Sequence, residues 1–161
     1  MGDHNPRELI VLTHGFMAHR FMLNVLARRL RRAGWNTDIW GYESFVTSVT
    51  THARNFSDFL AERCSDDRYD HIHLVTHSMG CIIGRMAIHQ VQSEKIKRFV
   101  MLTPPNRGSF VATKTAKIFG RFFRPVAELT TEKNSLVNSL EDPSDVEVGV
   151  IAAQQDTLVS L

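Results

Sequence analysis

The sequence predicts a single α/β domain built on a parallel sheet. Short apolar runs alternate along the 161-residue chain with segments in which apolar residues recur at helical spacing. The runs are apolar almost throughout, which is typical of strands that are covered on both faces. Together these observations favour a parallel sheet with helices on both sides. Hydrophobic residues make up 43% of the chain and charged residues 22%, which is enough apolar material for one domain with its own core.

The pattern places five strands and three connecting helices. Strands are expected at Glu8–Thr13, Asn36–Gly41, His71–Thr76, Lys97–Thr103 and Val146–Ala153. Helices are expected at Phe21–Ala33, Thr51–Cys64 and Met79–Gln92. The first helix should end at Gly34, because a glycine at that position readily takes the left-handed conformation that closes a helix. No repeat or low-complexity linker divides residues 1–161, so we expect one domain.

Composition excludes several classes of protein. The net charge of +2 is too small to indicate a nucleic-acid partner. No apolar run is long enough to span a membrane, and the first residues do not resemble a signal peptide. Cys64 and Cys81 have no metal-binding spacing and are expected to be free thiols, which fits a reducing compartment. These features predict a cytoplasmic protein.

No cofactor or metal is expected. No glycine-rich nucleotide-binding motif follows the first strand. His71 and His73 share one face of the third predicted strand, but no third candidate ligand accompanies them. We therefore interpret both as structural histidines.

The sharpest motif is Thr76-His77-Ser78-Met79-Gly80, between a predicted strand and a predicted helix. A tight strand-to-helix turn of this kind strains a serine and presents its hydroxyl as a nucleophile. The positions two before and two after the serine must be small to pack together, so Gly80 fits, whereas Thr76 is larger than the usual glycine. The Met79 N–H at the start of the helix is a candidate oxyanion donor. The alternative is that Ser78 is an ordinary N-cap.

A second oxyanion donor is expected on the loop after the first strand, where the sequence reads His14-Gly15-Phe16. Gly15 permits unusual dihedrals, and Phe16 would offer its N–H to the site. A plain turn is the alternative interpretation. The two motifs together are more specific than either one alone.

With these motifs the chain resembles the α/β-hydrolase fold family, in particular bacterial lipases and esterases. The matching segments are VLTHGF at 11–16, HLVTHSMGCIIGRMA at 73–87, FVMLTPPNRGS at 99–109 and GVIAAQQDTLV at 149–159. The resemblance implies a partial α/β-hydrolase fold with about five strands in the order 2-1-3-4-5. It also implies serine hydrolase chemistry on carboxylic esters.

The resemblance further implies a catalytic triad in the chain order serine, acid, histidine. Asp156, just past the last predicted strand, is the candidate acid, and a surface turn aspartate is the alternative. All eight histidines precede Asp156, so the base that the family requires is missing from these residues. His14 and His77 are weak substitutes for it. We expect a fragment that lacks a C-terminal strand and helix with the catalytic histidine, and a natural inactive form is the second interpretation.

The aromatic-rich segment 110–126 falls where family members insert a cap, so we expect a cap or lid at about 104–145. A plain packing helix or a helix on a membrane surface is the alternative. A cap favours a small-molecule ester with an apolar acyl group as the substrate. We expect weak or no activity from this chain alone. A thioesterase or amidase on the same site, or a non-catalytic binding module, remains open, as does the oligomeric state.

Overall fold

The computed structural model describes residues 7–16, 18, 20–44, 46–104, 143 and 145–152. Its elements follow one another along the chain as β1 (Glu8–Thr13), the 3-10 turn η1 (Arg20–Leu23), α1 (Asn24–Arg32), β2 (Asn36–Trp40), α2 (Val49–Cys64), β3 (His71–His77), α3 (Met79–Val91), β4 (Ile96–Leu102) and β5 (Glu147–Ile151). Every predicted strand and helix is present, and the bounds differ by a few residues at most.

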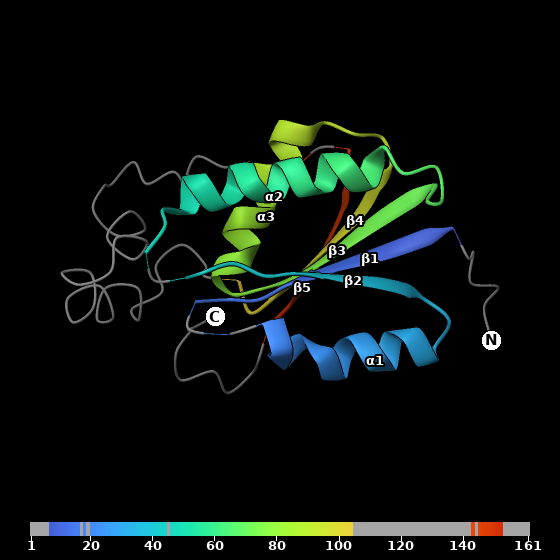
Figure 1. The fold of residues 1–161 in the computed structure, drawn as a ribbon, viewed down its shortest axis with the longest axis horizontal. Coiled ribbons are helices and arrows are strands. Elements are labelled where there is room, and N and C mark those ends of the chain that lie inside the picture. Colours follow the sequence, from blue (N-terminus) through green and yellow to red (C-terminus); the bar gives the residue numbers. More distant parts are fainter. Residues whose placement is uncertain are drawn as a thin grey trace.

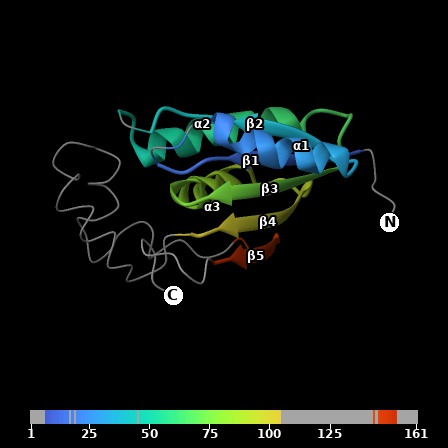
Figure 2. The ribbon, with the colours of Figure 1, turned by 90° about the horizontal axis from the view of Figure 1, so that it is seen from below.

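The strands form one parallel sheet in the order β2-β1-β3-β4-β5, which confirms the predicted order. Figure 2 shows them side by side, with β5 at one edge. Each strand begins at the same edge of the sheet, so the carboxyl ends of β1 and β3 are neighbours. Thr13 pairs with Thr76 in this register, which brings the loop after β1 beside the turn after β3.

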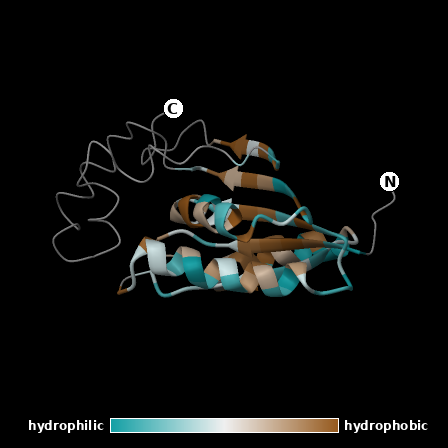
Figure 3. Ribbon diagram, turned by 90° about the horizontal axis from the view of Figure 1, so that it is seen from above, coloured by the Kyte–Doolittle hydropathy of each residue, from teal (hydrophilic) through white to brown (hydrophobic). Residues whose placement is uncertain are grey.

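Helices cover both faces of the sheet, as the apolar strands predict. In Figure 1, α1 lies on one face, and α2 and α3 lie on the other. The side chains of β1 alternate between two cores: Leu9 and Val11 join the cluster under α2 and α3, whereas Ile10 and Leu12 join the cluster under α1. Figure 3 shows the strands as predominantly hydrophobic and the helices as mixed.

The edge strand β5 departs from the expectation of full burial. Val150 and Ile151 are 54% and 59% exposed. Among the described strands β5 pairs only with β4, and the described helices pack mainly over the other strands. An apolar run therefore predicted a strand here, but not its position at the edge.

The helix ends have local causes. Ser48 caps α2 by accepting a hydrogen bond from the Thr51 N–H at 3.1 Å, so this helix begins earlier than predicted. α1 has no side-chain cap and starts from the 3-10 turn instead. Gly34 follows α1 with φ of 96°, as expected for a glycine that ends a helix. Within the described residues, no helix combines the length and apolarity that a membrane crossing requires.

Candidate active site

Ser78 occupies the turn between β3 and α3 with φ of 51° and ψ of −122°. This region is sparsely populated by residues other than glycine and costs of the order of 1–3 kcal/mol. The main chain of the turn is held by two hydrogen bonds, from Ser78 N–H to Leu102 O at 3.0 Å and from Cys81 N–H to Ser78 O at 2.8 Å. The strained turn predicted from the motif is therefore present.

The hydroxyl of Ser78 makes no capping hydrogen bond to α3. An ordinary N-cap serine would accept such a bond from an N–H in the first turn, and it would have extended dihedrals. Ser48 at the start of α2 does both, with φ of −65° and ψ of 153°. The comparison of the two serines within one chain argues against the N-cap interpretation of Ser78.

Position 80 must be a glycine because the end of β1 leaves no room there for a side chain. A Cβ atom at this position would lie 2.5 Å from His14 O and 3.1 Å from Thr13 Cγ2. The sequence had suggested contact between Gly80 and Thr76, but the nearest atoms all belong to Thr13 and His14. The motif's requirement for a small residue therefore comes from the neighbouring strand.

Thr76 takes the place of the usual glycine because another glycine makes room for it. A Cβ atom at Gly84, one turn further along α3, would lie 3.2 Å from Thr76 Cγ2 and 3.0 Å from the Phe99 ring. Thr76 is fully buried at this position. Gly84 of α3 therefore leaves the space that the threonine side chain needs at position 76.

Gly15 brings the loop after β1 into contact with the serine turn. A Cβ atom at Gly15 would lie 2.8 Å from Ser78 Cβ and 3.1 Å from both His77 O and His77 Nδ1. Gly15 is not among the residues with positive φ, and the structure gives a steric reason for a glycine here. What the position requires is space for Ser78, and Phe16 follows directly on this loop.

His14 is a buried part of the loop, and both of its ring nitrogens have partners. Nδ1 lies 2.9 Å from Gly15 O, and the Tyr42 N–H donates to Nε2 at 3.2 Å. Tyr42 also donates from its hydroxyl to His14 O at 2.9 Å, and the two rings stack with centroids 4.4 Å apart. These contacts leave His14 poorly suited to act as a base on Ser78.

Tyr42 and His52 complete this cluster, and no motif in the sequence pointed to either of them. His52 Nε2 lies 2.9 Å from Glu43 O, and its ring packs against Tyr42 at a centroid distance of 4.5 Å. Burial lowers the pKa of His52 and raises the pKa of the Tyr42 phenol. We name His14, Tyr42 and His52 the aromatic clamp.

Two of the other described histidines lie at the start of β3, and His77 lies at its end. His71 and His73 approach the Glu8 carboxylate, with 3.2 Å from His73 Nε2 to Glu8 Oε2, so they pair at the start of β1 and β3. Burial lowers the pKa of His73. His77 is exposed at the end of β3, directly before Ser78. No cluster of potential metal ligands occurs among residues that the structure describes.

Two sequence predictions fall outside the described residues. These are the acid role of Asp156 and the cap expected at about 104–145, of which only residues 104, 143 and 145 are described.

The free thiols predicted at Cys64 and Cys81 are present, and Cys81 is buried with its pKa raised by burial to about 11.

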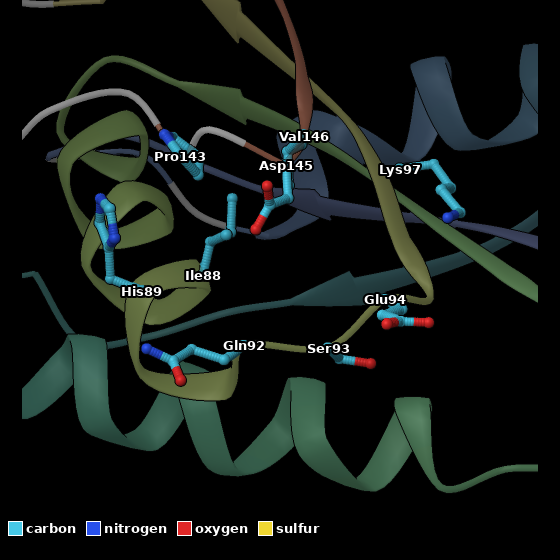
Figure 4. Close-up of a pocket in the computed structure, with 9 residues that line it drawn as sticks. All are labelled: Ile88, His89, Gln92, Ser93, Glu94, Lys97, Pro143, Asp145 and Val146. Carbon is cyan, nitrogen blue, oxygen red and sulfur yellow. The ribbon is translucent and has the colours of Figure 1, made fainter.

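A pocket of about 650 Å³ lies at the far end of α3 from Ser78 (Figure 4). Its walls come from the last turn of α3, the turn into β4, and the residues before β5. Its lining on α3 begins at Ile88, so at a rise of about 1.5 Å per residue the pocket lies about 14 Å along the helix from Met79. It is therefore separate from the candidate active site.

A parallel sheet in this order, with a strained serine turn at its carboxyl edge, defines a class of α/β proteins in which a backbone turn presents a nucleophile. The model of the alpha/beta hydrolase family matches residues 10–156, and the chain belongs to this family.

Several characterised or named proteins are similar to this chain. The Mycoplasma pneumoniae protein named "Putative esterase/lipase 2" is 23% identical over 146 residues, which are 84% of this chain and 54% of that protein. Bacillus licheniformis lipase BlEst2 in its mature form has a TM-score of 0.75 at 18% identity, covering 91% of this chain and 66% of the lipase. Pyrococcus furiosus esterase Pf2001 has a TM-score of 0.66 at 18% identity, covering 96% of this chain and 65% of the esterase.

At these identities the solved structures are similar to this chain in fold. The chain spans about half the length of its curated relative, at 54%.

Proposed function

We propose that this chain carries the nucleophile and the oxyanion donors of a serine carboxylic ester hydrolase that works through an acyl-enzyme on Ser78. The observation that carries the proposal is the strained conformation of Ser78, with φ of 51° and a hydroxyl that caps no helix. Strain of this kind persists where the surrounding structure enforces it, and it clusters at active sites. The names of the similar proteins, an esterase/lipase, a lipase and an esterase, support the same substrate class.

In the proposed mechanism the Ser78 hydroxyl attacks the ester carbonyl carbon, and its proton passes to a base. The carbonyl oxygen becomes an oxyanion that accepts hydrogen bonds from the N–H groups of Phe16 and Met79. Two observations favour these donors. Met79 is the first residue of α3, whose N-terminus favours negative charge, and Gly15 holds the Phe16 loop against Ser78. The alcohol then leaves, and water cleaves the acyl-enzyme.

The mechanism also requires a base and an acid. The hydrogen bonds of His14 and His52 occupy ring nitrogens that a base would need, and His71 and His73 sit at the opposite end of β3. Asp156 remains our candidate acid, although no histidine follows it in these residues. We therefore expect residues 1–161 alone to hydrolyse esters weakly, with a residual of about 10³–10⁴ over water from the oxyanion donors and binding.

The substrate we propose is a small-molecule ester with an apolar acyl group. A thioester or amide would react at the same serine and oxyanion donors, because all three carbonyl groups pass through the same tetrahedral intermediate. Turnover of matched p-nitrophenyl and thioester substrates of equal acyl length would distinguish these classes.

A fluorophosphonate probe tests the proposal, because it phosphonylates serines that are activated as nucleophiles. We expect one adduct, mapped by peptide mass spectrometry to Ser78 and absent from Ser78→Ala. Ser93→Ala, in the turn before β4, is the matched control and should label like the parent chain. Failure to label Ser78 in folded protein that also contains a histidine base after Asp156, or equal labelling of several serines, would favour a non-catalytic binding module.

A further inference from the structure

The aromatic clamp contacts the loop after β1 that carries Phe16, but it takes no part in the mechanism above. It joins three elements: His14 after β1, Tyr42 after β2, and His52 on α2. His14 is 2% exposed and His52 is 3% exposed, so neither side chain is available to a substrate. Their arrangement must therefore act through the groups that they hold.

The hydrogen bonds of the clamp define the tautomer of His14. The Tyr42 main-chain N–H can only donate, so His14 Nε2 must be the unprotonated acceptor in this 3.2 Å contact. The proton of the neutral ring is then on Nδ1, which lies 2.9 Å from Gly15 O and donates to it. A single orientation of the ring satisfies both contacts.

Gly15 O and the Phe16 N–H belong to the same peptide group. This peptide is trans, and in a trans peptide the C=O and N–H bonds point in opposite directions. A donor that holds Gly15 O therefore fixes the direction of the Phe16 N–H as well, away from the His14 ring. The Ala18 N–H also donates to Gly15 O, at 3.3 Å, so the histidine is the shorter of two restraints.

We propose that Tyr42 is a positioning residue, which through His14 orients the peptide between Gly15 and Phe16 so that the Phe16 N–H is presented to the oxyanion. Tyr42 does this with its main-chain N–H, which selects the tautomer, and with its hydroxyl, which holds His14 O at 2.9 Å. His52 supports Tyr42 from the other side, because its ring packs on the tyrosine and its Nε2 binds the carbonyl of the next residue, Glu43. The role assigned to Tyr42 rests on the function proposed above.

Tyr42→Phe is the informative variant. It removes the hydroxyl that bonds to His14 O and keeps both the stacked ring and the main-chain donor. The matched control is Tyr69→Phe, at the only other tyrosine of the chain, which lies between α2 and β3 with Arg68 over its ring. His14→Ala is the second variant and removes the donor to Gly15 O. Circular dichroism and thermal unfolding establish that each variant is folded.

The first readout is the rate constant for phosphonylation of Ser78 by a fluorophosphonate. We expect Tyr42→Phe to react about fivefold more slowly, as for the loss of one hydrogen bond, and His14→Ala to react at least about tenfold more slowly. Tyr69→Phe should react like the parent chain. Parental rates in folded Tyr42→Phe and His14→Ala would overturn the proposal and leave the proposed function standing.

The second readout does not depend on reactivity. Long-range ¹H–¹⁵N spectra of the His14 ring in the parent chain should show Nδ1 protonated and Nε2 unprotonated. Hydrogen exchange at the Phe16 amide should be faster in Tyr42→Phe than in Tyr69→Phe. A proton on Nε2, or equal exchange in the two variants, would overturn the positioning role. If protein that also contains a histidine base after Asp156 is not phosphonylated at Ser78, while the parent chain passes both spectroscopic tests, the proposed function alone would be refuted.

Discussion

Gly15 and Ser78 touch: a Cβ atom on the glycine would lie 2.8 Å from the Cβ atom of the serine. The loop after β1 and the turn after β3 are thus packed together at the carboxyl edge of the sheet. This contact places the Phe16 loop beside the proposed nucleophile, and it makes the geometry of one loop depend on the other.

The contact predicts that alanine is poorly tolerated at the two glycines of the site. Gly80→Ala should lower the free energy of unfolding by about 1–3 kcal/mol, because its methyl group meets the main-chain oxygen of His14, which cannot move alone. Gly15→Ala should lower stability as well and slow any reaction of Ser78. Urea unfolding and phosphonylation rates measure the two effects.

Gly149→Ala in β5 is the matched control for these variants. Of the described residues, its methyl group would meet only Val100 Cγ2, at 3.9 Å, which is ordinary van der Waals contact. Stability of Gly80→Ala equal to that of Gly149→Ala would contradict the packing described for the turn.

The strain at Ser78 predicts that glycine stabilises the protein more than alanine at this position, the reverse of their order in a helix. Ser78→Gly should be more stable than Ser78→Ala by about 1 kcal/mol, because glycine accepts φ of 51° without a steric penalty. At Ser57, inside α2, the same pair should differ in the opposite sense, because glycine destabilises helix interiors. Thermal unfolding of the four variants tests this, and alanine being the more stable residue at both positions would show that the turn is not strained.

The buried hydroxyl of Thr76 gives a third prediction. Its Oγ1 has no hydrogen-bond partner among the described residues, and the side chain is fully buried. Thr76→Val keeps the shape and removes the unpaired polar atom, so it should raise the free energy of unfolding by about 1 kcal/mol. Thr51→Val, which loses the contact between the hydroxyls of Thr51 and Ser48, should bring no such gain. A destabilised Thr76→Val would indicate that this hydroxyl has a partner.

Burial of His52 predicts that the free energy of unfolding decreases in acid. Its pKa is lowered from 6.5 by desolvation, so the folded state favours the neutral ring. Stability should be constant above about pH 6.5 and should fall as the pH drops from there towards the lower pKa of the folded state. His73 acts in the same direction, whereas Asp66, with a pKa of about 2, titrates far below this window.

His52→Gln should remove part of this loss of stability at low pH. Urea unfolding of the parent chain and the variant at about pH 7.5 and about pH 5 measures it as the difference between the two pH values. An identical loss in both proteins would mean that His52 is not responsible.

The sequence was sufficient for the fold and for the serine turn, because both depend on local patterns. Nearly continuous apolar runs placed the described strands, helical spacing placed the described helices, and the motif around Ser78 predicted the turn. The reasons given for its glycines were less accurate. Gly15 and Gly80 were assigned to backbone freedom and to contact with Thr76, whereas the structure shows close packing of Gly15 on the serine turn and of Gly80 on the end of β1.

Tyr42 and His52 could not be predicted as part of the site. Tyr42 lies in the loop after β2 and stacks on His14, and His52, on α2, packs against Tyr42. No spacing in the sequence links residues 14, 42 and 52. The exposure of β5 was missed for a similar reason, because an apolar run does not reveal whether a strand has one neighbour or two.

A structure of the chain with an alkyl boronic acid tests the central claim most directly, because boron forms a tetrahedral adduct with an activated serine without needing a complete triad. We predict a bond from Ser78 Oγ to boron, with one boronate oxygen about 2.7–3.1 Å from the main-chain nitrogens of both Phe16 and Met79. A boronic acid bound without a bond to Ser78, or an adduct whose oxygens point away from these two nitrogens, would contradict it.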